Sequence, residues 1–255
     1  MTVQIFTSVV NRPRFLEYQA RLFRKYLRND YRFHVVDDSV QDAVTGEYER
    51  VCREHGLLYH RKPKRIRRQD PSAATSAAIQ WAYDTLIRPR HASEIVLFLD
   101  SDMFLIDAFD VEAYIDGYAI AGLLQRRGHV VYLWNGLMLF NMPQIMRHGG
   151  DLDFSCGRIE GFAVDTGGGL YHFIHRDGVK LRETDPGMQP QYPRELDGIA
   201  LRDAAATQGY DMELHCGGRF LHYRAASNWF GDWRSTREPL EAKLALLERV
   251  IATRL

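Results

Sequence analysis

The chain has 255 residues, of which 45% are hydrophobic and 26% charged, a composition typical of a soluble globular protein. Its 33 basic and 33 acidic residues leave no net charge, so no general attraction to nucleic acid or to an anionic membrane is expected. The three widely spaced cysteines argue against a disulfide framework and for a reducing compartment.

The N-terminus has the pattern of a first strand rather than of a signal peptide, because no basic start precedes a long apolar stretch. No segment approaches the roughly 18 consecutive apolar residues of a membrane span. These features predict a cytoplasmic protein without a membrane span.

The first hundred residues alternate between strand and helix patterns. A β-branched, apolar run at residues 3–10 predicts a strand, and apolar residues at helical spacing over 12–27 predict a helix that begins near Pro13. Further strands are predicted at 31–39, 57–62 and 95–99, and further helices at 46–56 and 70–87. This alternation predicts an α/β fold with a doubly wound, mainly parallel sheet.

The alternation weakens after about residue 110. Two apolar runs within residues 118–142, separated by the turn-like "RRGH", suggest strands in an antiparallel or mixed part of the sheet. A loop is predicted at 177–193 and a late strand within 218–229. The C-terminal segment from 237 onward predicts a helix whose apolar face carries Leu240, Leu244, Leu247 and Ile251.

Polar residues end three of the predicted strands. They are Thr7 and Ser8, Asp37 to Ser39, and Asp100 to Asp102. Ligands of doubly wound sheets bind beyond the carboxyl ends of the strands. The connectivity therefore predicts a binding site where these three strand ends gather.

Asp100 and Asp102 follow a buried strand in the stretch "FLDSDMF". Two carboxylates this close repel each other unless a positive charge lies between them, and a divalent cation can supply it. Hard oxygen ligands suit Mg²⁺ or Mn²⁺, which keep positions open for phosphate oxygens. The alternative is that one aspartate caps the following turn while the other is exposed. The polar ends of the neighbouring strands favour the metal site.

The order of "FTSVVNRP", "HVVDDS" and "IVLFLDSDMFLI" resembles the GT-A-fold glycosyltransferases, which use nucleotide sugars. The resemblance implies that Thr7 and Ser8 open the nucleotide pocket and that Asp37 or Asp38 contacts the base. It also implies that Asp100, with Asp102, binds the metal and the diphosphate as a D-x-D motif.

The same resemblance implies how the chain is divided. We expect one GT-A-like domain over 1–255, with a Rossmann-like nucleotide-binding half at about 1–108. A mixed-sheet acceptor half would follow at about 109–235 and a C-terminal helix at about 236–255.

Two motifs of the second half resemble this class as well. "LWNGLMLFNM" is similar to the strand that lines the sugar and acceptor pocket, which nominates Trp134, Asn135 and Gly136. "FLHYRAASNW" resembles the late histidine motif that completes the metal site, which makes His222 the third ligand. Because Mn²⁺ accepts imidazole better than Mg²⁺ does, Mn²⁺ is the preferred ion.

The reaction could proceed with either stereochemical outcome. Inverting members carry an acidic residue after an aromatic–glycine turn, and Asp165 in "GFAVDTGGG" matches the position of that general base. In retaining families of the glycogenin-like and lipopolysaccharide galactosyltransferase type, Asp197 would match a motif aspartate. Those families have a diphosphate-binding lysine where this chain has Ser227 or Asn228, although Arg219 or Arg224 could replace it. We expect inversion.

Further alternatives are a sugar nucleotidyltransferase and a non-enzymatic carbohydrate- or nucleotide-binding module. The first would carry a glycine-rich basic loop after the opening strand, which "TSVVNRPRF" lacks. The expected partners are a nucleotide-diphosphate sugar and a glycan, glycolipid or protein-linked sugar acceptor. The basic run Arg61–Arg68 is either a solvated loop or a surface for phosphates or anionic lipid headgroups, which would allow peripheral membrane association.

Overall fold

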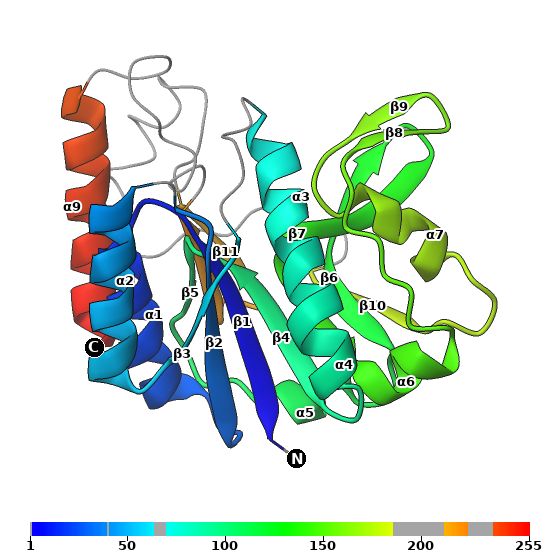
Figure 1. Cartoon of the computed structure of the whole chain (residues 1–255), viewed down its shortest axis with the longest axis horizontal. Helices are drawn as coiled ribbons and strands as arrows, with labels where there is room; N and C mark the ends of the chain where they lie inside the picture. The colour runs from blue at the N-terminus through cyan, green and yellow to red at the C-terminus, as the bar shows by residue number, and fades with distance from the viewer. Residues whose placement is uncertain (1, 40, 64–69, 186–211, 224–236) are drawn as a thin grey trace.

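Strands and helices alternate over the first hundred residues, as the sequence predicts (Figure 1). The computed structural model describes residues 2–39, 41–63, 70–185, 212–223 and 237–255. The first elements are β1 (Val3–Val9), α1 (Pro13–Tyr26), β2 (Tyr31–Asp37), α2 (Asp42–His55), β3 (Leu58–Arg61), α3 (Pro71–Ala82), the π-helical turn η1 (Tyr83–Ile87), α4 (Arg88–Arg90) and β4 (Ile95–Asp100). Helix α2 begins earlier than predicted, because Gly46 in its interior weakens the helical pattern there.

The second half is richer in short strands. Its elements are β5 (Met103–Leu105), α5 (Val111–Ile115), β6 (Ile120–Arg127), β7 (Val130–Asn141), α6 (Met142–Arg147), β8 (Gly157–Ile159), β9 (Phe162–Val164), the 3₁₀ turn η2 (Gly168–Leu170), α7 (Tyr171–Ile174), β10 (Leu181–Glu183), β11 (Met212–His215), β12 (Phe220–Tyr223) and α9 (Arg237–Arg254). The two apolar runs around "RRGH" form the antiparallel hairpin β6–β7, as expected.

A seven-stranded sheet in the order β10-β6-β7-β4-β1-β2-β3 joins both halves. Strands β1 to β4 are parallel to one another, and β7 is antiparallel to both of its neighbours, β4 and β6. The sheet is therefore mainly parallel with a mixed region, and the predicted fold class is confirmed. Parallel pairing brings the carboxyl ends of β1, β2 and β4 to one edge.

One prediction about the later chain needs correction, and another is confirmed. The segment 177–193 is not all loop, because β10 pairs with β6 at the edge of the sheet. The late strand is present as β12, which lies between β11 and β5 in a separate antiparallel sheet. Strands of three or four residues show too few alternations to be recognised from their pattern.

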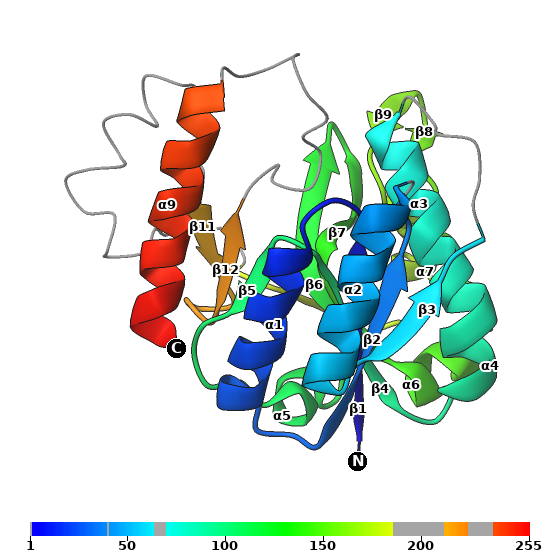
Figure 2. The same ribbon diagram turned by 60° about the vertical axis from the view of Figure 1, so that its left-hand side comes forward.

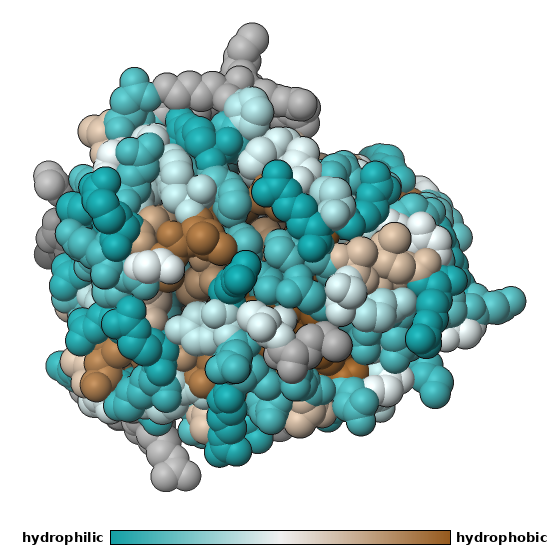
Figure 3. Space-filling view, turned by 60° about the horizontal axis from the view of Figure 1, so that its bottom comes forward, coloured by the Kyte–Doolittle hydropathy of each residue, from teal (hydrophilic) through white to brown (hydrophobic). Residues whose placement is uncertain are grey.

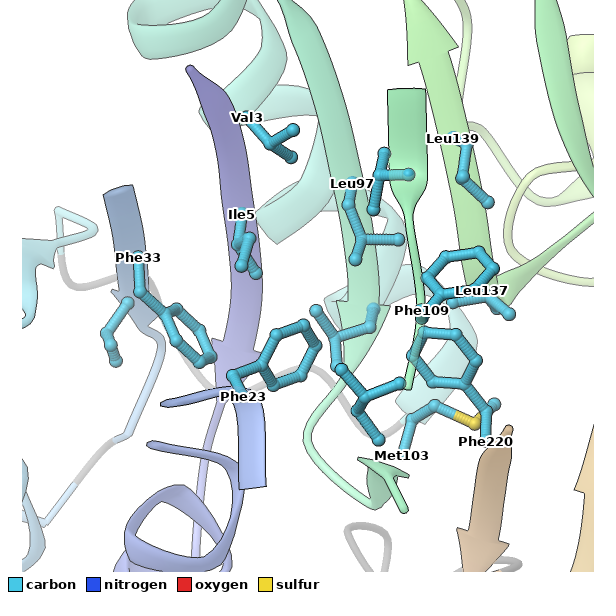
Figure 4. Close-up of a cluster of buried hydrophobic side chains, with 14 of the residues drawn as sticks. Val3, Ile5, Phe23, Phe33, Leu97, Met103, Phe109, Leu137, Leu139 and Phe220 are labelled. Atoms are coloured by element: carbon cyan, nitrogen blue, oxygen red, sulfur yellow. The ribbon is translucent and has the colours of Figure 1, made fainter. Parts of the chain in front are cut away.

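Alternate residues of the central strands face two different cores. On one side, side chains of β1, β4 and β7 meet α1 and the hairpin strand β12. Figure 4 shows this core, with Val3, Ile5, Leu97, Leu137, Phe23 and Phe220 among its members. On the other side, Phe6 and Phe98 pack against α3 and the residues that follow it. The sheet thus lies between two helical layers.

Helix α9 packs against α1 at one end of this assembly (Figure 2). Leu247 and Ile251 are buried there, as predicted for the apolar face, and Leu244 is partly buried. The side chain of Leu240 lies outside the described residues. The hydroxyl of Tyr26 on α1 donates to the carbonyl of Arg254 over 2.7 Å, which ties the end of α9 to the first helix.

Exposed apolar residues are scattered over the surface. Leu58, Met146 and Phe162 are the large hydrophobic residues exposed in the described part of the chain, and they lie on β3, α6 and β9. Figure 3 shows hydrophilic and hydrophobic residues interspersed over the face in view. Single exposed apolar residues of this kind are normal for a globular protein. None of the described helices has the length and apolar character needed to cross a bilayer.

Candidate active site

The three polar strand ends lie side by side at one edge of the sheet. Ser8 of β1 is the register partner of Asp100 on β4, and Val9 is the partner of Asp37 on β2. A cavity of about 420 Å³ opens where β4 ends. Its wall carries the acidic and imidazole side chains of Asp100, Asp102, Asp165, Glu213, His215 and His222. A polar cavity at this position is where doubly wound sheets bind ligands.

Asp100 is held at the cavity wall by two hydrogen bonds. The Ser101 amide donates to Oδ1 over 3.1 Å, and Asn135 Nδ2 on β7 donates to Oδ2 over 3.3 Å. Burial raises the pKa of Asp100 to about 6, and the nearby charge of Asp165 adds to this, while the two hydrogen bonds oppose it. The wall therefore places a carboxylate where its negative charge is costly without a cation.

Asp102 faces His222 across the cavity. Asp102 is 2% exposed, and its Oδ1 lies 3.7 Å from His222 Nε2, which is longer than a hydrogen bond. The backbone carbonyl of Asp102 accepts from the Tyr223 amide over 2.9 Å, which fixes β12 beside the D-x-D turn. The predicted ligands Asp100, Asp102 and His222 thus all line one cavity.

Strand β11 adds two residues that the sequence reasoning missed. Glu213 Oε1 lies 2.8 Å from His222 Nδ1 and 3.3 Å from His215 Nε2. Burial alone would raise the pKa of Glu213. The hydrogen bonds and charges of the two histidines together lower it by more, so the pKa of Glu213 lies well below the usual range. Glu213, His215 and His222 form the one group of three or more possible metal-ligating side chains found among the described residues. The signal was the alternation in "MELH", which puts Glu213 and His215 on one face of a strand.

Asp165 lies directly after β9 and also lines the cavity. Its amide donates to the Tyr132 hydroxyl over 3.1 Å. Its Oδ1 accepts from the Thr166 amide over 2.8 Å and from the hydroxyl of Ser72 at the start of α3. Both side-chain hydrogen bonds converge on Oδ1, and among the described residues none goes to Oδ2. The carboxylate is thereby oriented with one oxygen left for a ligand in the cavity.

Gly136 and the glycines that follow Asp165 allow neighbouring protein groups to pack closely against the backbone. A Cβ on Gly136 would lie 2.0 Å from the Trp134 ring, and one on Gly167 would lie 2.3 Å from the Leu133 carbonyl oxygen. The ring of Trp134 stands 4.8 Å from that of His222, so Gly136 allows Trp134 to pack beside the histidine. A Cβ on Gly168 or Gly169 would also meet protein atoms, those of Val164 and Asp153, so this glycine run packs closely against the rest of the chain.

The two aspartates that end β2 have different surroundings. Asp37 is fully buried and accepts from the Ser39 amide at 2.8 Å, from the Tyr59 hydroxyl at 2.7 Å and from Arg61. Asp38 pairs with Lys62 over 2.6 Å and remains partly exposed. Asp37 is thus a structural anchor, and Asp38 is the aspartate with a side chain accessible to a ligand.

The predicted nucleotide residues of β1 lie outside the cavity wall. Thr7 is fully buried, whereas Ser8 is 7% exposed, and neither lines the 420 Å³ cavity.

The basic run Arg61–Arg68 is described only at its start. Its residues Arg61 and Lys62 form ion pairs with Asp37 and Asp38. Positions 64–68 lie outside the described residues, as do Asp197, Ser227, Asn228 and Arg224. Arg219 donates to the Cys216 carbonyl within the β11–β12 turn.

Comparison with solved structures identifies the fold. The galactosyltransferase LgtC, as an active-site mutant and in complex with donor and acceptor sugar analogs, matches with TM-scores of 0.53 and 0.51 at 15% sequence identity. Both alignments cover 96% of this chain and 95% of LgtC. A mannosyltransferase, PcManGT from Pyrobaculum calidifontis in complex with GDP-Man and Mn²⁺, matches with a TM-score of 0.43 at 14% identity, over 97% of this chain and 69% of its own. The sequence matches no protein-family model and no curated protein at a significant level.

The similarity to LgtC shows a shared fold. The chain has the mixed α/β, GT-A-like architecture that the sequence motifs predict, with its mainly parallel sheet and the cavity at the carboxyl end of β4.

Proposed function

We propose that this protein is a metal-dependent glycosyltransferase that moves a sugar from a nucleotide-diphosphate sugar to a hydroxyl group of a glycan, glycolipid or protein-linked sugar. The observation that carries the proposal is one cavity lined by Asp100, Asp102, Asp165 and His222 in a GT-A-like fold. These residues come from separate parts of the chain and converge at the carboxyl end of a parallel strand.

Asp100, Asp102 and His222 would hold the metal ion. Two carboxylates and one imidazole are a donor set that fits Mn²⁺, and Mg²⁺ less well. The raised pKa of Asp100 supports a cation here, because a positive charge would relieve the cost of its buried carboxylate. When bound, such an ion supplies Lewis-acid neutralisation of the diphosphate leaving group.

The strand ends of β1 and β2 would bind the nucleotide. Ser8 is the register partner of Asp100, which supports a contact between its hydroxyl and the nucleotide, while Thr7 would be a buried support. Asp38 is the better of the two aspartates for the base, because Asp37 is occupied by Ser39, Tyr59 and Arg61. Asn135 orients Asp100, and Gly136 leaves room for Trp134 beside the sugar position.

Asp165 would act as the general base of an inverting reaction. Its Oδ2 would take the proton of the acceptor hydroxyl while Ser72 and the Thr166 amide hold Oδ1. The acceptor oxygen would then attack the anomeric carbon from the face opposite the leaving diphosphate. The alternative is a retaining reaction that uses Asp197.

The cellular setting is proposed from the sequence. We expect a cytoplasmic enzyme that associates with a membrane at most peripherally, through the part of Arg61–Arg68 that does not neutralise Asp37 and Asp38.

Turnover of nucleotide sugars with and without Mn²⁺ tests the proposal. Chelator-treated wild-type protein should release nucleoside diphosphate from one of a panel of nucleotide sugars only after Mn²⁺ is added, and Asp102→Asn should abolish this. A nucleotidyltransferase would instead release pyrophosphate from a nucleoside triphosphate and a sugar phosphate. Binding without turnover would indicate a binding module, and either outcome would contradict the proposal.

A further inference from the structure

The hairpin β11–β12 carries a line of polar side chains that ends at Asp102. Both ring nitrogens of His222 lie near a carboxylate: Nδ1 is 2.8 Å from Glu213 Oε1, and Nε2 is 3.7 Å from Asp102 Oδ1. Behind Glu213, His215 Nε2 lies 3.3 Å from the same oxygen, and His215 Nδ1 lies 3.9 Å from Asp185 Oδ2. The line therefore runs Asp185, His215, Glu213, His222, Asp102.

The contact with Glu213 determines which nitrogen of a neutral His222 carries the proton. A carboxylate can only accept a hydrogen bond, so the 2.8 Å contact places the proton of neutral His222 on Nδ1. In the neutral imidazole Nε2 would then carry the lone pair, and it lies 3.7 Å from Asp102 Oδ1. Only an unprotonated imidazole nitrogen can ligate a metal.

The backbone holds Glu213 in this position. Glu213 and His222 are direct register partners across the antiparallel pair β11–β12, so their side chains leave the sheet on the same face. Asp185 accepts from the amides of Cys216 at 2.6 Å and Gly217 at 2.9 Å, which anchors the turn between the two strands. Trp134 packs against both histidine rings, at 4.8 Å from His222 and 6.2 Å from His215.

We propose that Glu213 is a positioning residue for the metal site: it fixes the tautomer and the orientation of His222. The contact of His215 with the same carboxylate oxygen restricts the position of Glu213 in turn. This inference rests on the proposed function in so far as His222 Nε2 ligates the ion. A partner of this kind raises the basicity of a ligating imidazole, and its loss typically weakens metal binding by about 10–100-fold.

The tautomer can be measured without any metal. In chelator-treated protein with ¹⁵N-labelled histidine, long-range ¹H–¹⁵N NMR should show His222 protonated on Nδ1 in the wild type. The His222 signals are assigned by their absence in His222→Gln. In Glu213→Gln we expect a mixture of both tautomers. A wild-type His222 protonated on Nε2, or a tautomer unchanged in Glu213→Gln, would overturn the proposal.

Mn²⁺ affinity provides the second measurement, by titration calorimetry of the full chain without donor. Glu213→Gln should bind Mn²⁺ about 10–100-fold more weakly than the wild type. Glu183→Gln removes the same charge from β10, where Glu183 pairs with Arg126 outside the cavity, and should leave the affinity unchanged. A second Mn²⁺ equivalent in the wild type that Glu213→Gln loses would make Glu213 a direct ligand and overturn the positioning role.

The two measurements also separate this inference from the proposed function. If Asp102→Asn leaves Mn²⁺ affinity unchanged while His222 is protonated on Nδ1, the assignment of the metal to the D-x-D motif fails and the Glu213–His222 contact stands. If Asp102→Asn weakens binding and Glu213→Gln does not, the metal site stands and the role of Glu213 is wrong.

Discussion

Single residues at the cavity show a conflict between stability and chemistry. Asp100 ends a buried strand, and its neighbours are the carboxylate Asp165 and the amide of Asn135. Its raised pKa means that the folded state resists ionising this group, whereas the unfolded chain does not. A carboxylate in this position destabilises the folded state unless a ligand of opposite charge offsets that cost.

Asp100→Asn should therefore stabilise the metal-free protein while it removes activity. Because the pKa of Asp100 is raised in the folded state, its penalty grows as pH rises through the range between its unfolded and folded pKa values, and it is fully present at pH 7.5. Removing it should raise the free energy of unfolding by roughly 1–3 kcal/mol at that pH. Urea denaturation with chelator measures this. A less stable variant at pH 7.5 would show that the charge of Asp100 is not a burden.

Asp165→Asn tests the general base. The asparagine keeps the shape and can still accept from Ser72 and the Thr166 amide, but it cannot take a proton. Transfer should fall by about 10²–10⁴-fold while the affinity for nucleoside diphosphate stays nearly the same. The anomeric configuration of the product, observed by NMR, decides independently. A product with the configuration of the donor would assign the reaction to the retaining class and remove Asp165 from this role.

At the scale of elements, the segment that follows the β8–β9 hairpin packs against the pocket wall through backbone contacts. Gly167 has a φ of 87°, donates its amide to the Phe154 carbonyl and lies against the carbonyl of Leu133 on β7. The position of Asp165 therefore depends on how closely this segment approaches β7. Packing between elements, more than the turn's own sequence, orients the carboxylate.

Gly167→Ala should lower the free energy of unfolding by about 2 kcal/mol or more. The added Cβ meets a backbone oxygen at 2.3 Å, and the left-handed φ alone costs an alanine about 1–2 kcal/mol. Gly46→Ala is the matched control: it lies inside α2 with nothing within 4 Å, so it should gain about 0.5–1 kcal/mol from helix propensity. Denaturant melts of both variants measure the difference. Equal stability of the two would contradict the close approach at Gly167.

At the scale of the whole molecule, a histidine group lies on the α3 side of the sheet, away from the cavity. His34 of β2 stacks on Phe6 at 4.3 Å and contacts His60 and Gln4, each over 2.9 Å. Burial, together with the positive charges that His60, His91, Arg32 and Arg90 carry when protonated, lowers the pKa of His34 to about 3. The pKa of His60 is lowered too.

The protein should therefore lose stability in mild acid. A depressed folded pKa means that the unfolded chain binds more protons below pH 6.5, so stability is fully present above pH 6.5 and is lost as pH falls toward 3. Between pH 7.5 and 5 the contribution of His34 is about 2 kcal/mol. His34→Gln should flatten the profile of unfolding free energy against pH, and His172→Gln, at an exposed site, should not. A profile that His34→Gln leaves unchanged would assign the acid sensitivity to other groups.

The sequence by itself determined the alternation of strands and helices and the polar ends of β1, β2 and β4. These features follow from local periodicity and from the rule that parallel strands end at a common edge, so they need no knowledge of distant contacts. The place of the D-x-D pair after β4 could be predicted for the same reason, whereas the GT-A-like fold was predicted from the resemblance of three motifs to a known family. Short strands such as β10 and β11 could not, because three or four residues carry too little pattern.

Only the tertiary structure decided which of the polar residues act together. Ser72 and Asp165 are 93 positions apart, and Asn135 meets Asp100 across 35 positions. Glu213 lies at the cavity because the pairing of β11 with β12 sets it opposite His222, and Asp37 is held by Arg61 and Tyr59, which reach it from β3. Hydrogen bonds are short-ranged and directional, so the partner of each polar group depends on how the elements pack. The sequence pattern gives the order of these elements along the chain but not their positions in space.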